Sequence, residues 1–244
     1  MIILVAVIYP IQASWKWGGG FLNDMGFQDF TSSTFVHSVS GWAALTGAIF
    51  FSLHLGEYKG GKVNPMPGSN LALATLGIFI LWLSWFGFNS CSQLYMDTSG
   101  SVADISSIFS NTNTVPAAGA VAALTLTPSL IQSTMIGTVS GIIVVFAMPM
   151  LDRMKIDYVV DAISVHLFAG IWGTLAVYFT NSAATFSVQL TSTLIVGAFV
   201  TVTTAFVWLV LKATAGLRVS EEVEIMSLGR NRLGMEAYPA FSGS

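Results

Sequence analysis

Long uncharged stretches alternate with short polar connections along this chain. Segments without Asp, Glu, Lys or Arg run over Phe30–Gly56, Val63–Met96, Ile105–Leu151 and Ala162–Leu211. A helix that crosses the hydrocarbon core of a bilayer needs about 20 consecutive apolar residues. The first two segments are long enough for one span each, and the last two are long enough for two spans each. The pattern therefore predicts about six membrane-spanning helices.

Clusters of Gly, Pro and polar residues give the approximate limits of these spans. Pro128, in the sequence TLTPS, divides the third segment into two helices, and YMDTSGSVAD is expected to form the loop before it. The opening sequence MIILVAVIYP is apolar but too short to span, so it predicts half a helix. The other expected spans cover Phe30–Leu53, Leu71–Cys91, Val160–Phe179 and Leu190–Leu211. The predicted fold class is an all-α, polytopic helix bundle in a membrane.

Composition agrees with a membrane protein and excludes several other classes. Only 9% of the residues are charged, whereas soluble domains carry about 25%. The net charge of −3 does not suit a nucleic-acid-binding protein, which needs a basic patch. With one cysteine, Cys91, and three histidines, an intrachain disulfide is excluded and a structural zinc site is not expected. We expect neither a metal nor a cofactor.

Loop charges test the predicted number of spans, because Lys and Arg gather in short cytoplasmic loops. With six alternating spans, Lys59 and Lys62 lie on the side opposite Arg153, Lys155 and the cations of the tail. One further span between residues 94 and 152 would place all of these cations on one side. The sequence therefore behaves as if one helix were missing.

Two histidines lie inside predicted spans, where an ionisable side chain is energetically expensive and marks a functional candidate. His37 and His166 both follow Val and precede Gly by four residues, in VHSVSG and VHLFAG. Repeated halves that each supply one side of a site at the bilayer midplane are a recurring plan in transporters. The alternative is two unrelated histidines that bond neighbouring backbone. The third histidine, His54, ends its span and is expected at the membrane interface.

Five segments of the sequence together resemble one protein family. They are YPIQASWKWGGGFL, DFTSSTFVHSVSGW, LWLSWFGFN with Ser92, DAISVHLFAGIWGTL and GLRVSEEVE. They resemble the ammonium transporter family, Amt/MEP/Rh, in its Amt branch. The resemblance implies a trimer in which each subunit is an eleven-helix bundle of two inverted halves around a narrow pore. It begins in the middle of the fourth family helix, and the eighth helix is expected to be missing at VAALTLTPS, so we expect a partial ammonium-transporter fold.

The resemblance also assigns roles to individual residues. His37 and His166 match the paired histidines of the family's pore. Trp17 and Ser92 match residues of the external site that recruits ammonium. Phe88 matches one of two stacked phenylalanines that gate the pore below that site.

Two acidic residues are candidates for supporting roles. Asp29 matches a buried acid near the recruitment site, and Asp161 lies where the second half of the family often has Asp or Gly. From the residues alone, Asp29 is equally well interpreted as a cap for the helix that begins at Phe30. From the residues alone, Trp17 is better interpreted as an anchor at the membrane interface, the usual role of Trp at membrane boundaries. Both interpretations of each residue remain open.

The expected activity follows from the cost of moving a charge through hydrocarbon, which is on the order of tens of kcal/mol for an intact NH4+. Trp17 would bind the cation with its ring, Ser92 would accept a hydrogen bond, and ammonia would then pass the histidines uncharged. The expected function is ammonium transport, without enzymatic activity. The alternatives are a truncated, non-conducting family member or inactive subunit, and a membrane ammonium sensor, which the lack of an output domain after Ser244 disfavours.

Organisation and partners also follow from the resemblance. We expect a membrane domain over residues 1–217 and a cytoplasmic C-terminal tail over residues 218–244, in the plasma (inner) membrane. The expected partners are ammonium or ammonia, the lipid bilayer, further copies in a homotrimer, and a cytoplasmic regulatory protein at the tail.

Overall fold

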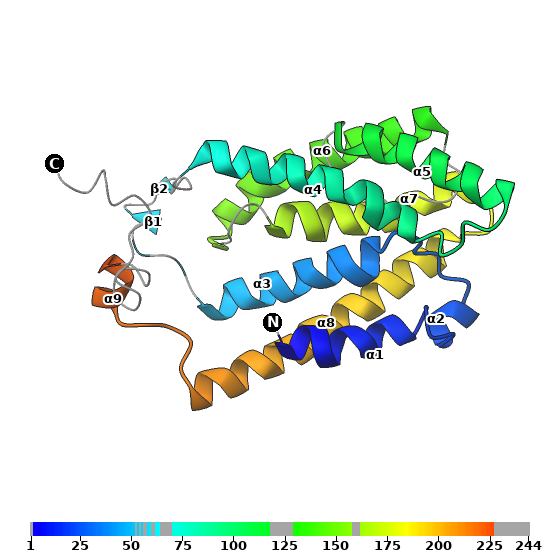
Figure 1. Cartoon of the computed structure of the whole chain (residues 1–244). Coiled ribbons are helices and arrows are strands. Elements are labelled where there is room, and N and C mark those ends of the chain that lie inside the picture. Colours follow the sequence, from blue (N-terminus) through cyan, green and yellow to red (C-terminus); the bar gives the residue numbers. More distant parts are fainter. Residues whose placement is uncertain are drawn as a thin grey trace.

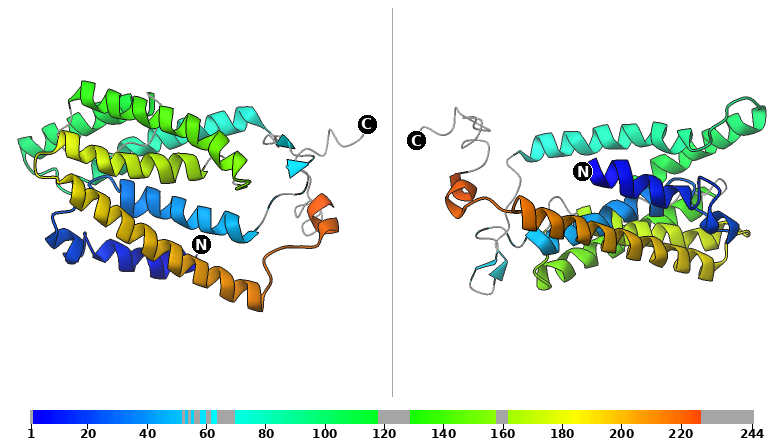
Figure 2. Two further views of the ribbon diagram at one scale, coloured as in Figure 1. Left: turned by 180° about the vertical axis from the view of Figure 1, so that it is seen from behind. Right: turned by 90° about the horizontal axis from the view of Figure 1, so that it is seen from below.

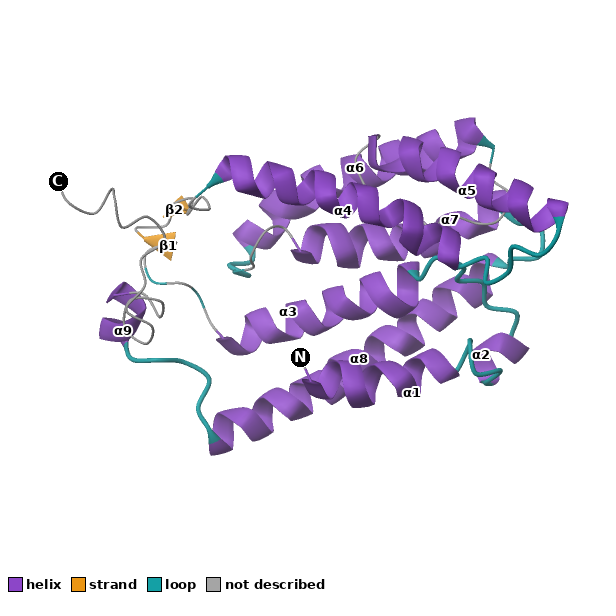
Figure 3. Ribbon diagram, viewed as in Figure 1, coloured by secondary structure: helices purple, strands orange, loops and turns teal. Residues whose placement is uncertain are grey.

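The fold is a bundle of long helices that run roughly lengthwise beside one another (Figure 1, Figure 3). The computed structural model describes residues 2–51, 53, 55, 58–59, 62–63, 70–117, 129–157 and 162–226. The membrane-protein fold class that the sequence predicts is confirmed. The elements are η1 (Leu4–Ile8), α1 (Tyr9–Ser14), α2 (Phe21–Asp24), η2 (Ser33–Ser38), α3 (Val39–Phe51), β1 (Tyr58–Lys59), β2 (Lys62–Val63), α4 (Leu71–Cys91), α5 (Ser99–Ala117), α6 (Leu130–Arg153), η3 (Ile163–Phe168), α7 (Ala169–Thr180), α8 (Phe186–Thr214) and α9 (Glu221–Met226).

Five of the helices in the described ranges are long and apolar enough to cross a membrane. They are Ser33–Phe51, Leu71–Cys91, Leu130–Arg153, Ile163–Thr180 and Phe186–Thr214. The sixth expected span corresponds to α5, whose sequence SGSVADISSIFSNTNTVPA contains too many Ser, Asn and Thr residues to meet the same measure. The short apolar helix Leu4–Ser14 agrees with the expected half helix.

Two connections between the predicted spans differ from the sequence prediction. The expected loop YMDTSGSVAD is shorter, because α5 already begins at Ser99. Asp104 therefore lies inside a helix, where its carboxylate accepts a hydrogen bond from Gln93 at 3.2 Å. The polar connection after α3 contains a two-residue antiparallel pairing, in which Tyr58 is opposite Val63.

Helices α5 and α6 begin at the same end of the bundle and run in the same direction (Figure 1, Figure 2). Helix α5 is antiparallel to α4, as the contacts Gln93–Asp104 and Asn89–Thr112 show. Helix α6 is antiparallel to η3 and α7, as the contacts Ile136–Trp172 and Leu151–Ile163 show. Two consecutive parallel helices require the chain to return between them. Most of that connection, residues 118–128, lies outside the described residues, and so does most of the junction VAALTLTPS.

The parallel pair explains the distribution of loop cations. The β1–β2 pairing, the end of α6 with Arg153, and the end of α8 with Lys212 all lie at one end of the bundle, on the left in Figure 1. This is the arrangement that one further crossing was expected to produce. Of the Lys and Arg residues that the structure describes, Lys16 alone lies at the opposite end, after α1 and before α2.

Glycines allow the helices around the centre of the bundle to approach closely. A Cβ on Gly41 would lie 2.5 Å from the backbone nitrogen of Leu167, so α3 and η3 meet almost backbone to backbone. A Cβ on Gly197 of α8 would lie 2.7 Å from the Trp42 ring. Phe35 and Val39 pack into the same buried cluster as residues of α8. The central pair of helices is therefore held by a close steric fit.

We predict that Gly41→Ala destabilises the protein by about 1–3 kcal/mol, because either the α3 or the η3 backbone must move to accommodate the methyl group. Gly77→Ala is the matched control, since a Cβ at Gly77 of α4 meets nothing within 4 Å. Thermal unfolding in detergent measures both variants. Equal melting temperatures for Gly41→Ala and the wild type would contradict the close approach of α3 and η3.

Candidate functional site

Both pore-candidate histidines lie in a π-helical segment at the start of a long span. His37 belongs to η2, where its backbone N–H donates to the carbonyl of Ser32, five residues earlier, at 3.1 Å. His166 belongs to η3, which continues into α7 as η2 continues into α3. Single π-helical turns inside α-helices are frequent at functional sites. The sequence repeat around the two histidines thus has a matching repeat in local structure.

The two imidazole rings lie nearly coplanar and edge to edge, with their Nδ1 atoms pointing at each other. Their Nδ1 atoms are 3.0 Å apart, and their planes are inclined by only 3° with ring centroids 5.2 Å apart. A hydrogen bond between two Nδ1 atoms needs a proton on one of them and a free lone pair on the other. If both rings were cations, both Nδ1 atoms would carry protons and the bond would be lost. The pair therefore shares one Nδ1 proton.

Two glycines hold the histidines together in a reciprocal way. Gly41 follows His37 by four residues and touches Leu167, the neighbour of His166. Gly170 follows His166 by four residues, and a Cβ there would lie 3.1 Å from the backbone nitrogen of Ser38, the neighbour of His37. Each half of the sequence repeat thus supplies one histidine and one glycine, and the missing side chain of that glycine lets the helix of the other half pack closely.

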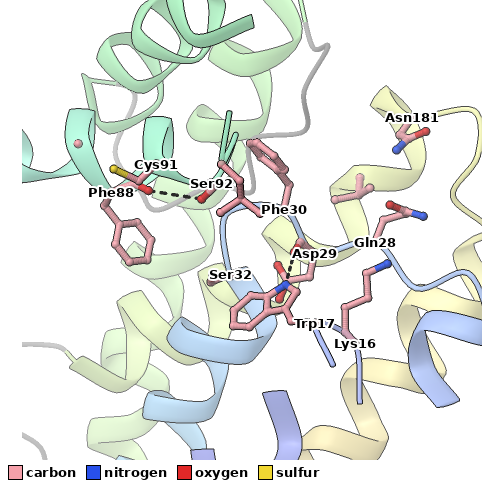
Figure 4. A pocket seen from close by; sticks show the side chains of 13 residues that line it. Lys16, Trp17, Gln28, Asp29, Phe30, Ser32, Phe88, Cys91, Ser92 and Asn181 are labelled. Atoms are coloured by element: carbon pink, nitrogen blue, oxygen red, sulfur yellow. Dashed lines mark hydrogen bonds between the residues drawn. The ribbon is translucent and has the colours of Figure 1, made fainter. Parts of the chain in front are cut away.

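A cavity of about 1080 Å³ lies between the end of α4 and the N-terminal part of the chain (Figure 4). Phe88, Cys91 and Ser92 line it from the end of α4, and Lys16, Trp17 and Asp29 line it from the N-terminal part of the chain. The other lining residues are Gln28, Phe30, Ser32, Gly87, Leu94, Val177 and Asn181. The histidines do not line the cavity themselves.

Phe88 connects the cavity to the histidines. Its ring lines the cavity and lies edge-on against the His37 ring, with centroids 6.2 Å apart. On the cavity side, Trp17 is 46% exposed, and its indole N–H donates to the carbonyl of Asp29 at 3.4 Å. The Ser92 hydroxyl donates to the Phe88 carbonyl at 3.4 Å, which leaves the oxygen of that hydroxyl free to accept a bond. An aromatic face and an acceptor therefore border one space.

Asp29 is 3% exposed and caps the helix that carries His37. Its Oδ2 accepts hydrogen bonds from the backbone N–H groups of Thr34 at 3.1 Å and Phe35 at 2.9 Å, while Oδ1 has no partner. Burial raises the pKa of Asp29 to about 6, although these backbone bonds and the nearby Lys16 charge oppose the rise. The structure thus supports the capping interpretation of Asp29 and also places its carboxylate beside the cavity.

A single side chain from the last long helix fixes the loop before Asp29. The Gln189 side-chain oxygen accepts from the Gln28 backbone N–H at 2.9 Å, and its nitrogen donates to the Gln28 carbonyl at 2.8 Å. The same nitrogen donates to the Thr174 carbonyl at 3.0 Å. Thr34 and Thr174 then bond each other through their hydroxyls at 2.6 Å. Gln189 therefore joins α8, α7 and the cavity loop in one buried polar network.

Comparison with known proteins assigns the chain to a family. The model of the Ammonium Transporter Family matches residues 1–129 and 120–238. The chain belongs to this family. A putative ammonium transporter of Synechocystis is 33% identical over 272 residues, which cover 96% of this chain and 62% of that protein. Ammonium transporter Amt2 of Archaeoglobus fulgidus is 33% identical over 299 residues, which cover 98% of this chain and 63% of that protein.

Solved structures agree with this assignment. A protein named Sensor Amt Protein superposes with a TM-score of 0.87 at 28% identity, over 94% of this chain and 67% of that one. Mep2 of Candida albicans has the same fold, with a TM-score of 0.77 at 22% identity, over 90% of this chain and 59% of that one.

The chain spans about three fifths of the length of the two ammonium transporters. Both alignments are longer than the 244 residues of the chain, so these relatives carry residues inside the matched region that this chain lacks. The family model breaks into two matches that overlap at residues 120–129, where the eighth helix was expected to be missing.

The structure brings most of the residues that the family resemblance singled out into one region. His37 and His166 meet, Phe88 touches His37, and Trp17, Ser92 and Asp29 border the cavity. Asp161 and His54 lie outside the described residues. No sequence pattern pointed to Gln189, whose partners are 161 and 15 residues away. Lys16 was also not predicted as a site residue, although it directly precedes Trp17 in the chain.

We predict that Asp29 makes stability depend on pH. Because its pKa is raised in the folded protein from an ordinary 3.8 to about 6, its protonated form favours folding. This contribution is fully present below about pH 4 and is lost as pH rises through about 6. The stability of the wild type relative to Asp29→Asn should therefore fall by about 2 kcal/mol between pH 4 and pH 7.

Asn keeps an oxygen for the Thr34 and Phe35 N–H groups but does not titrate, so it isolates the charge of the carboxylate. Chemical denaturation of the purified protein in detergent at several pH values measures the difference. Parallel stability curves for the two proteins would show that Asp29 keeps its ordinary pKa.

Proposed function

We propose that this chain carries out ammonium transport along a path from the cavity, past Phe88, to the His37–His166 pair. The observation that supports this most strongly is the hydrogen bond between two imidazoles inside two spans of a chain that belongs to the ammonium transporter family. The related proteins of Synechocystis and Archaeoglobus fulgidus carry the name of ammonium transporters. These relatives belong to a family of transporters, and no enzymatic role is proposed.

Recruitment of the cation is the first step of the proposal. The exposed face of Trp17 offers a cation–π contact worth about 0.5–2 kcal/mol. Ser92 offers a hydroxyl oxygen, and the buried Asp29 adds negative charge to the same cavity when it is ionised. NH4+ is a donor of hydrogen bonds only, so acceptors and an aromatic face suit it chemically.

Loss of a proton is the second step. The apolar ring of Phe88 cannot replace the water that hydrates a cation, and the transfer of a cation to hydrocarbon costs on the order of tens of kcal/mol. NH4+ therefore transfers one proton to a water molecule of the solvent that reaches the open cavity, so that H3O+ returns to that solvent and neutral NH3 moves on past Phe88. NH3 has one lone pair and three N–H groups, so it can exchange hydrogen bonds with an imidazole pair that holds a single shared proton.

Orientation and assembly belong to the same proposal. The loop cations near α6 and α8 gather at one end of the bundle, which under the positive-inside rule faces the cytoplasm. The cavity then opens outward, and the tail that begins at residue 218 lies in the cytoplasm. We also propose a plasma-membrane location, a homotrimer and a regulatory partner at the tail, which membership of the family supports.

A membrane ammonium sensor is the second candidate function. The similar structure named Sensor Amt Protein favours it. A sensor needs a link from the pore helices to the tail, and Arg218 provides a contact of that kind. Its guanidinium donates to the Leu53 carbonyl, after α3, at 2.6 Å and pairs with Glu224 of α9 at 2.8 Å.

Uptake of labelled methylammonium by cells that lack other ammonium transporters tests the proposal. We expect the full chain to support uptake above that of the empty vector. His166→Ala and His37→Ala should each lower the rate at least tenfold, because either change removes the shared bond. Gly77→Ala, where the added Cβ meets nothing within 4 Å, should transport like the wild type.

Protein insertion is measured in the same cells, so that a low rate is compared at equal amounts of protein. No uptake by a wild type that is inserted and folded would overturn the transport proposal and favour the non-conducting member of the family or the sensor.

A further inference from the structure

The cavity contains a second cationic group besides its proposed substrate. Lys16 follows α1 directly and lines the cavity beside Trp17 (Figure 4). Its ammonium group donates to the side-chain oxygen of Asn23 at 3.0 Å. Asn23 is a neutral amide, so this bond orients the Lys16 charge without cancelling it.

The charged groups around Lys16 are few. Among the residues that line the cavity, Lys16 and Asp29 are the ones with charged side chains. Asp29 attracts Lys16 electrostatically, but its Oδ2 is already held by two backbone N–H groups. In the part of the chain that the structure describes, no ion pair joins Lys16 to a carboxylate. The positive charge of Lys16 thus faces the space in which an ammonium ion would bind.

The position of Lys16 is also unusual within the molecule. The other described Lys and Arg residues lie at the opposite end of the bundle. Lys16 is therefore the described basic residue whose field acts at the cavity, and the cations at the far end contribute little because salt screens them beyond about 10 Å.

We propose that Lys16 sets the affinity of the cavity for ammonium by acting as a tethered competitor. This inference rests on the proposed recruitment of ammonium in the cavity. The Lys16 ammonium group and the substrate are the same kind of ion, and both are attracted by Asp29. Binding of NH4+ places two positive charges in one partly enclosed space, and their repulsion weakens binding.

The size of the effect follows from Coulomb's law. Two unit charges about 10 Å apart, at an effective dielectric constant of about 20, change a dissociation constant on the order of tenfold. Screening by salt reduces this to a smaller factor as the Debye length falls to about 3 Å at 1 M. The cavity with Lys16 is therefore half-saturated at a higher ammonium concentration than the same cavity without Lys16.

Direct binding of ammonium chloride to the purified full chain in detergent tests this proposal. Calorimetry at low ionic strength compares the wild type with Lys16→Gln, which keeps a donor for Asn23 and removes the charge. We expect Lys16→Gln to lower the dissociation constant about fivefold to tenfold, with a smaller difference in 1 M sodium chloride. Lys16→Arg keeps the charge and should bind like the wild type.

Two further variants are controls. Lys212→Gln removes one charge at the far end of α8 and should leave binding unchanged. Lys16→Met tests the same prediction without a donor, in case the Gln variant melts at a lower temperature than the wild type.

The outcomes separate this inference from the proposed function. Equal dissociation constants for the wild type, Lys16→Gln and Lys16→Met would overturn the role of Lys16 and leave recruitment intact. If Lys16→Arg also bound ammonium more tightly than the wild type, the effect would come from side-chain shape rather than charge, and the proposed role of Lys16 would be overturned. Absence of saturable ammonium binding in every variant would overturn recruitment at the cavity, and the role of Lys16 with it.

Discussion

The close approach of two π-helical turns, η2 and η3, is the constraint on which the rest of the site depends. Gly41 and Gly170 leave no room for a methyl group against the opposite turn. Only because of this does the Nδ1 atom of His37 come within 3.0 Å of that of His166. The cavity, the Phe88 ring and the Asp29 cap are arranged around this contact. A bundle with the same spans but looser packing at the two glycines would contain the histidines without bringing them together.

Part of this arrangement was predictable from the sequence. Uncharged stretches predicted the long helices, because burial in lipid requires apolar length, and the repeated spacing of Val, His and Gly predicted two equivalent halves. The limits of α5 were missed because its Ser and Asn residues look like a loop. The π-helical bonding around His37 and His166 could not be predicted, since it depends on tertiary contacts that no local propensity records. Gln189 could not be predicted, because its role exists only once segments 161 residues apart are adjacent.

Two consecutive residues at the cavity have opposite electrostatic effects on a cation. Lys16 and Trp17 are consecutive, and the turn after α1 directs both toward the same space. An aromatic face attracts a cation and an ammonium side chain repels it, so in the proposed recruitment of ammonium the balance between the two residues decides how tightly the cation binds. Family resemblance draws attention to Trp17, while the physical effect of Lys16 emerges only when the shared cavity is seen.

The Gln28–Gln189 bridge has a consequence for how the molecule is assembled. Gln28 belongs to the early part of the chain, whereas Gln189 belongs to the last long helix. During synthesis the backbone groups of Gln28 therefore wait for their protein partner until α8 has entered the bilayer. The loop that borders the cavity is therefore fixed only after α8 has inserted, so a nascent chain lacks a complete cavity until then.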